Sequence, residues 1–334
     1  MGDGTRYPRR VSAAELRPGP TASRIGYVLV ALSAVCASGG GVFARLAIDA
    51  GVAPEQIAGI RIYGAATILL VAFLPHARKL RRSDLLPMVL FSLSGLVLGQ
   101  GAYFQAISRV DIAIVLVVVF TAPLVVTAYQ RIRHAERLPR YAYGAVLVAI
   151  AGVTMAILGS GKPLGSLSIV GLAFALVAMI TYVIAVVIAA RLPTTLPPLA
   201  RTGACMLLAA LVWLVLAPPW NLPFEALGAT AGFSGRFGFA LPVWVAMAFV
   251  VLIGSVGVYV CWVAGTIRVG AGASSMVGMI EPVLAAIVAW GLLGQSLTPV
   301  QSVGIGLTVT CIVIVEHARI RGPGASAPDV PVDL

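Results

Sequence analysis

The segment Gly101-Ala-Tyr-Phe-Gln-Ala-Ile-Ser-Arg109, followed by Thr121-Ala-Pro123, has a counterpart in the second half of the same chain. The counterpart reads Val260-Cys-Trp-Val-Ala-Gly-Thr-Ile-Arg268 and is followed by Ile280-Glu-Pro282. The offset from position 123 to position 282, 159 residues, also places Arg109 on Arg268. Several matches at a single offset indicate a duplicated unit, because chance likenesses do not keep one register.

Both copies of the unit are strongly apolar. The 334 residues are 60% hydrophobic and 10% charged, with a mean hydropathy of +1.00, whereas a soluble domain has about 25% charged residues. A soluble core cannot bury that much apolar surface, so the composition predicts an all-α polytopic membrane protein. The net charge of +11 fits basic cytoplasmic loops rather than a nucleic-acid partner. The four cysteines lie in apolar runs without disulfide-framework or metal-site spacing.

Ten apolar runs are long enough to cross a bilayer at about 20 residues each. They lie near 25–46, 56–74, 86–107, 112–130, 141–159, 168–190, 199–217, 242–264, 271–293 and 300–315. We therefore expect two five-helix repeats, 25–159 and 168–317. The tails at 1–24 and 318–334 are rich in Pro, Gly and small polar residues and are expected to be disordered.

The positions of the basic residues predict how the helices cross the membrane. With a cytoplasmic N-terminus, most of the 23 Lys and Arg residues fall on the cytoplasmic side. Both termini are then cytoplasmic, and five helices in each copy make the second repeat inverted relative to the first. Inverted repeats are typical of secondary transporters. The alternative is that the duplication built a stable bundle without transport.

Short motifs in both copies resemble the EamA repeat of the drug/metabolite transporter (DMT) superfamily. They are Pro54 with Arg61, Ala135-Glu136-Arg-Leu, the Gly144 to Gly152 spacing, Ile280-Glu281-Pro282-Val-Leu-Ala-Ala and Leu292-Leu-Gly-Gln295-Ser-Leu-Thr-Pro299. The resemblance implies ten helices, inverted repeats and movement of a small metabolite, commonly outward. The second half is also similar to amino-acid exporters of the threonine and homoserine type.

Two positions depart from the pattern of that family. Gln295 stands where the second repeat usually has Glu, and Ser38-Gly39-Gly40-Gly41 stands near the place where the first helix usually has Trp-Gly. The second departure bears on any substrate assignment that depends on the first helix.

Glu281 is the acidic residue in the middle of a predicted span, beside the helix-breaking Pro282. An ionisable group there is costly, so a functional role is the first hypothesis. The helical period places Ser274 on the same face. Glu281 binds a proton or a substrate amino group, or pairs permanently with a buried Arg, or accepts hydrogen bonds from backbone groups freed at Pro123 and Pro282.

A polar and aromatic group is predicted to surround this carboxyl. Arg61 either holds a substrate carboxylate, locks an outer gate, snorkels to the interface or forms a fixed bridge to an acidic group. Gln100 and Tyr103 share one helix face, and the offset places Tyr259 and Trp262 at the equivalent positions. Two such faces predict the walls of a central cavity; the alternative is aromatic packing. Thr121 is a further candidate of this kind.

These features predict a secondary transporter in the cytoplasmic membrane that works by alternating access. The expected partners are the lipid bilayer, a small metabolite such as a zwitterionic amino acid, and a coupling proton; a homodimer is an option. No cofactor, metal ion or nucleic acid is expected. An enzyme is disfavoured because His76, His134 and His317 are expected in separate cytoplasmic loops or ends and the acidic residues are scattered. A non-transporting scaffold or sensor, or an exchanger of another metabolite class, stays open, and the loop at 218–241 is either a lid or a connector.

Overall fold

The computed structural model describes residues 20–122, 125, 140–159, 168–189, 192, 195–270, 274, 277–278, 280–295 and 297–321. The first half contains α1 (Pro20–Asp49), α2 (Pro54–Phe73), η1 (Leu74–Lys79), α3 (Arg82–Phe91), η2 (Ser92–Gly99), α4 (Gln100–Ile107), α5 (Ile112–Val119) and α7 (Arg140–Leu158). The second half contains α8 (Ile169–Ala189), α9 (Pro198–Leu216), η4 (Pro219–Asn221), α10 (Phe224–Gly228), β1 (Thr230–Gly232), β2 (Ala240–Pro242), α11 (Val243–Val251), η5 (Leu252–Gly257), α12 (Val258–Val269), α14 (Glu281–Leu293) and α15 (Pro299–Arg321).

Six helical stretches within these residues are long and apolar enough to cross a membrane. They are Arg24–Asp49, Pro54–Lys79, Arg82–Ile107, Ile169–Ala189, Pro198–Leu216 and Val243–Val269. Shorter apolar helices lie at Leu147–Ala156, Glu281–Leu293 and Pro299–Ile314. The run expected at 112–130 begins with α5 and continues into residues outside the described ranges. The chain is therefore a helical membrane protein, and the count of ten spans stays a prediction.

Two helix ends differ from those expected from the apolar runs. Residues 20–24 and 318–321, which we assigned to the tails, belong to α1 and α15. Composition misplaced these ends because basic side chains are compatible with a helix that continues beyond the hydrocarbon core. Within the run expected at 271–293, Ser274, Val277 and Gly278 are helical, and α14 begins at Glu281. Pro282 lies in the first turn of α14, where proline's missing N–H costs nothing.

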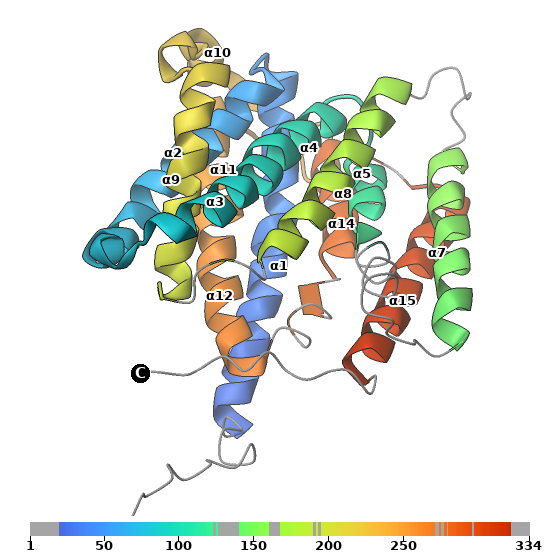
Figure 1. Cartoon of the computed structure of the whole chain (residues 1–334). Coiled ribbons are helices and arrows are strands. Elements are labelled where there is room, and N and C mark those ends of the chain that lie inside the picture. The colour runs from blue at the N-terminus through green and yellow to red at the C-terminus, as the bar shows by residue number, and fades with distance from the viewer. Residues whose placement is uncertain are drawn as a thin grey trace, which may run out of the picture.

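Equivalent helices of the two halves make equivalent contacts. α1 packs on α12 and α14, and α8 packs on α4 and α5. α2 packs on its counterpart α9, α5 on α14, and α7 on α15. Figure 1 shows α7 and α15 side by side at one edge of the bundle and α2 with α9 at the opposite edge. This pattern is what two related halves produce, while their opposite orientation across a bilayer stays a prediction.

The likeness extends to single contacts between helices. A Cβ atom added at Gly26 would lie 2.8 Å from Cβ of Arg268, and one added at Gly171 would lie 2.8 Å from Cβ of Arg109. Arg109 and Arg268 are related by the offset of 159 residues, so α1 and α8 approach their neighbours at matching places. Both positions require glycine because any side chain would separate the helices.

Two π-helical segments occupy matching positions in the halves. η2 spans Ser92–Gly99 and η5 spans Leu252–Gly257, which fall together when one half is shifted by the offset. A π-helical segment changes the backbone hydrogen-bonding pattern within a helix and is frequent at functional sites. Each segment lies in the middle of a long spanning stretch.

The loop at 218–241 contains a short helix and an antiparallel hairpin. β1 pairs with β2 in the register Ala231 to Leu241. Backbone N–H groups of Gly235 and Phe237 donate to the carbonyl oxygens of Leu292 and Gly291, at 2.7 and 3.0 Å. The hairpin thus satisfies carbonyl groups that the C-terminal end of α14 leaves without intrahelical partners.

Candidate functional site

Arg61 is held in the middle of the bundle by contacts from both halves of the chain. Its Nε donates to Oγ of Ser255 at 2.6 Å, Nη1 donates to Oε1 of Gln100 at 2.8 Å, and Nη2 donates to the carbonyl oxygen of Gly254 at 2.9 Å. The guanidinium also lies 5.8 Å from the ring centroid of Phe104. These contacts fix Arg61 inward, and they use three of its five N–H groups. The other two have no acceptor among the described residues.

The close approach of α1 to η5 leaves room for the groups that bind Arg61. A Cβ atom added at Gly40 would lie 3.2 Å from Cα of Gly254, and one added at Gly41 would lie 2.6 Å from the Tyr103 hydroxyl. The glycine run in the first helix, where the family usually has Trp-Gly, therefore makes room for η5 and for Tyr103. A larger residue at either position would displace groups that surround Arg61.

Three further polar groups lie near Arg61. Glu281, Tyr103 and Tyr259 all lie within electrostatic range of its guanidinium, and each side chain is half-buried. In the described part of the chain, none of the three side chains has a hydrogen-bond partner, and Glu281 forms no ion pair with Arg61 within 4.0 Å. Glu281 thus lies near the fixed Arg61 guanidinium without forming a direct ion pair with it.

This geometry bears on the hypotheses for both charged residues. A permanent Arg61–Glu281 ion pair is absent among the described residues, and so is a backbone hydrogen bond to the Glu281 carboxyl. Arg61 does not snorkel, because its guanidinium is bound to η5 and to Gln100. Binding of a proton or an amino group by Glu281 stays a prediction.

The remaining predicted site residues have other local roles. Ser274 is buried and donates to the carbonyl oxygen of Gly270 at 2.9 Å, and Thr121 donates to that of Val118 at 2.7 Å. Trp262 packs against Gly278, whose added Cβ would lie 2.9 Å from its ring. The hydroxyls of Ser274 and Thr121 thus bond to their own backbone. Pro123 lies outside the described residues.

The sequence did not single out Ser255 and Gly254 as partners of an arginine. Ser255 Oγ accepts the hydrogen bond from Arg61 and donates to the carbonyl oxygen of Val250 at 2.8 Å. Both residues lie in η5, where small side chains suggested only close helix packing. No periodic pattern marks a π-helical segment, so a serine buried within an apolar run was the one available signal.

The C-terminal end of α14 carries a further contact between the halves. Oε1 of Gln295 accepts a hydrogen bond from the backbone N–H of Ile112, at 3.3 Å. Ile112 is the first residue of α5, so Gln295 satisfies one of the N–H groups that every helix start leaves free. The departure from Glu at this position keeps a hydrogen bond and removes a negative charge from the start of α5.

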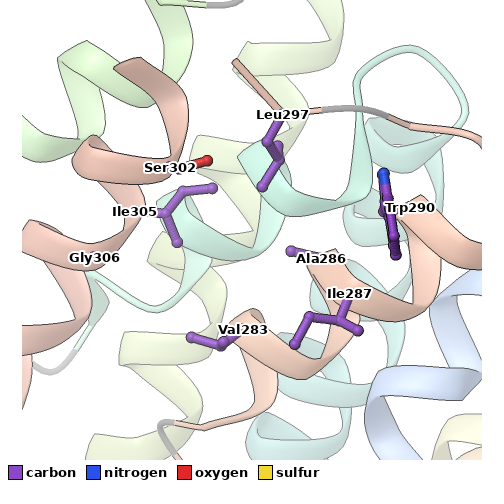
Figure 2. Close-up of a pocket in the computed structure, with 8 residues that line it drawn as sticks. All are labelled: Val283, Ala286, Ile287, Trp290, Leu297, Ser302, Ile305 and Gly306. Carbon is purple, nitrogen blue, oxygen red and sulfur yellow. The ribbon is translucent and has the colours of Figure 1, made fainter. Parts of the chain in front are cut away.

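A cavity of about 380 Å³ lies on another face of α14, between α14 and α15. It is lined by Val283, Ala286, Ile287, Trp290, Leu297, Ser302, Ile305 and Gly306 (Figure 2). None of these is a predicted site residue, and neither Glu281 nor Arg61 is among them. The cavity is thus separate from the polar group around Arg61.

Comparison with known proteins identifies the family. A family model described as the EamA-like transporter family matches residues 24–158 and again residues 169–316. The chain is 27% identical over 277 residues to the uncharacterized inner membrane transporter YedA of Escherichia coli strain K12 and to the proteins of the same name in strains O6:H1 and O157:H7. Those alignments cover 81% of this chain and 84% of YedA.

A protein of known crystal structure has a related fold, with a TM-score of 0.52 and 19% sequence identity, over 88% of this chain and 96% of that one. This likeness concerns the fold alone. The narrower resemblance to amino-acid exporters stays a prediction. Because the family match covers most of the sequence in two stretches, the chain belongs to the EamA-like transporter family.

Proposed function

We propose that this protein is a secondary transporter that exports a small zwitterionic metabolite, such as an amino acid, across the cytoplasmic membrane. The observation that carries the proposal is the Arg61 guanidinium, fixed by Ser255, Gln100 and Gly254, with two N–H groups left over. Location in the cytoplasmic membrane is supported by the name of the YedA relatives, which describes them as inner membrane transporters.

A zwitterion suits the charges around this centre. Its carboxylate can accept hydrogen bonds from the two remaining N–H groups of Arg61, as paired N–H donors bind carboxylates well. Its ammonium group can pair with Glu281, which has no partner among the described residues. Both charges of the zwitterion are then paired. Tyr103 and Tyr259 contribute hydroxyls and aromatic surface beside Arg61.

Alternating access is the proposed route, with two inverted five-helix repeats rocking about the centre. Support comes from the matching contacts of the two halves and from the position of Arg61, which binds η5 of the second half from α2 of the first. Inverted-repeat transporters bind substrate at the repeat interface near the bilayer midplane. Export is proposed from the resemblance to the DMT superfamily.

Coupling to a proton through Glu281 is part of the same proposal. A carboxyl with no fixed partner can exchange a proton for the substrate ammonium group during the cycle. The two cations then compete for one site, which is sufficient to link their movements.

The first experiment identifies the substrate class. The purified protein is screened for thermal stabilisation by amino acids, dipeptides and sugars, because a ligand that binds the folded state raises its stability. For the best amino acid, the free form is compared with its N-acetylated and its C-amidated forms. We expect stabilisation by the free form alone, since each derivative removes one charge.

Flux then separates transport from the alternatives. Proteoliposomes loaded with unlabelled substrate are assayed for counterflow of the labelled compound. Absence of flux for every stabilising compound would favour a scaffold or sensor. Equal binding of the free and the amidated forms would contradict the role of Arg61 while leaving transport intact.

A further inference from the structure

α14 separates two environments. At 3.6 residues per turn, Glu281 and Ala285 fall on one face of this helix, and Val283, Ile287 and Trp290 fall on the opposite face. The first face is directed to the centre of the bundle, where Ala285 is fully buried. The second lines the cavity between α14 and α15, and its Ile287 is 57% exposed. We call this cavity the α14–α15 groove.

The length and position of the α14–α15 groove suit an acyl chain within one membrane leaflet. Trp290 lies one turn before the end of α14, and from there to Val283 the groove runs for about 10 Å. One leaflet of the hydrocarbon core is about 15 Å thick. The wall is apolar apart from the Ser302 hydroxyl and the Trp290 indole nitrogen, as the labelled side chains in Figure 2 show. Tryptophan near a helix end is typical of the membrane interface.

A cation lies at the end of the groove where a headgroup would be. The guanidinium carbon of Arg236 lies 4.7 Å from the ring centroid of Trp290. Arg236 is exposed, and in the described part of the chain its N–H groups have no hydrogen-bond acceptor. An arginine stacked on an aromatic ring keeps the edge of its guanidinium free for a phosphate.

We propose that the α14–α15 groove binds a phospholipid, with one acyl chain between α14 and α15 and the phosphate on Arg236. The charge at the interfacial end and the apolar wall below it match the two parts of such a molecule. A helix of a second copy fits poorly. A volume of about 380 Å³ over about 10 Å leaves about 40 Å² of cross-section, roughly half of what a helix about 10 Å wide occupies.

The chain offers matched variants for a test. Arg236→Gln removes the phosphate ligand, and Gly306→Leu fills the groove, since a Cβ atom at Gly306 meets nothing within 4 Å. Arg109→Gln is the control for charge, because Arg109 is also exposed and lies 5.4 Å from the ring centroid of Phe174. Gly144→Leu is the control for bulk, because Gly144 likewise has open space at its Cβ.

The measurement is native mass spectrometry of the full chain with phosphatidylglycerol titrated into detergent. We expect one tightly retained lipid, whose affinity falls about tenfold in Arg236→Gln, the order expected for a charge-assisted hydrogen bond. Gly306→Leu is expected to lose it as well, and both controls to retain it. Melting temperatures of the lipid-free variants show whether each variant is folded.

Two additional ligands separate the sources of the signal. Diacylglycerol, which lacks the phosphate, is expected to bind more weakly and equally to the wild type and Arg236→Gln. Inorganic phosphate is expected to leave the retained lipid in place. Equal lipid retention in all four variants would overturn the proposal, as would displacement by phosphate alone. A dimer that dissociates in Gly306→Leu would show that a second copy occupies the groove.

Discussion

The two faces of α14 differ in polarity. On the central face, Glu281 lies opposite Arg61, whose guanidinium is fixed by three hydrogen bonds. On the opposite face, Val283, Ile287 and Trp290 line a groove with few polar atoms. The first face can be read from sequence because a charge within an apolar run is costly. The second cannot, because apolar side chains toward lipid and toward protein look alike.

The largest effect is expected from Arg61→Lys on the central face. Lysine keeps the charge, but its ammonium group cannot reproduce the planar set of donors that binds Ser255, Gln100 and a substrate carboxylate together. We expect counterflow to fall about 100-fold, the order of two lost hydrogen bonds to a charged group. Arg109→Lys is the control. Near-normal counterflow in Arg61→Lys would show that substrate binds elsewhere.

Glu281→Gln is expected to separate binding from coupling. The amide keeps the shape of the side chain but cannot exchange a proton or pair with an ammonium group. Stimulation of flux by an imposed pH gradient is expected to disappear, and the amino-acid affinity to fall about tenfold, the order of one lost charge pair. Flux is measured in proteoliposomes with and without the gradient. Unchanged stimulation would exclude Glu281 as the coupling residue.

A smaller effect is expected from Gln295→Ala, just beyond the end of α14. The substitution removes the acceptor of the Ile112 N–H group at the start of α5. We expect a loss of about 0.5–1 kcal/mol of stability, typical of a helix cap, measured as a lower thermal midpoint in detergent. Gln295→Glu is the matched variant, and it is expected to be at least as stable as the wild type because a carboxylate favours a helix N-terminus. A more stable Gln295→Ala variant would contradict this role.

The smallest effect is expected from Ile287→Ala on the groove face. Its side chain is 57% exposed, so the substitution leaves the central face intact and changes stability by about 0.5 kcal/mol or less. Counterflow is expected to stay within about twofold of the wild type, a difference below 0.5 kcal/mol. A large loss of counterflow would mean that the two faces of α14 are coupled more closely than their contacts indicate.

Much of the site could be predicted because its charges are rare in this chain. Arg61, Glu281 and the aromatic residues near them are predicted from a charge within an apolar run and from one offset. The sequence did not identify Ser255 and Gly254 as hydrogen-bond partners of Arg61, since their role depends on the packing of η5 against α2. Ser274 is predicted to share the face of Glu281 and Thr121 to line the cavity, and in the structure both hydroxyls bond to their own backbone. A hydroxyl within a helix can always bond in this way, and sequence does not show which partner it takes.

The fold likewise combines features that the sequence predicts with features that it does not. Apolar length predicted the six stretches of the described residues that are long enough to cross a membrane. It placed the helix ends several residues short at α1 and α15, because charges do not stop a helix. The groove was not predicted because it depends on the spacing between α14 and α15. The sequence of neither helix alone determines this spacing.

The hairpin formed by β1 and β2 has a mechanical consequence. It holds the last carbonyl groups of α14 through Gly235 and Phe237, with Ser234 donating to that of Leu293 at 3.1 Å. The same hairpin runs directly into α11. A tilt of α14 must therefore either break these hydrogen bonds or move the first turn of α11 with it. The hairpin thus couples the C-terminal end of α14 to the N-terminal end of α11.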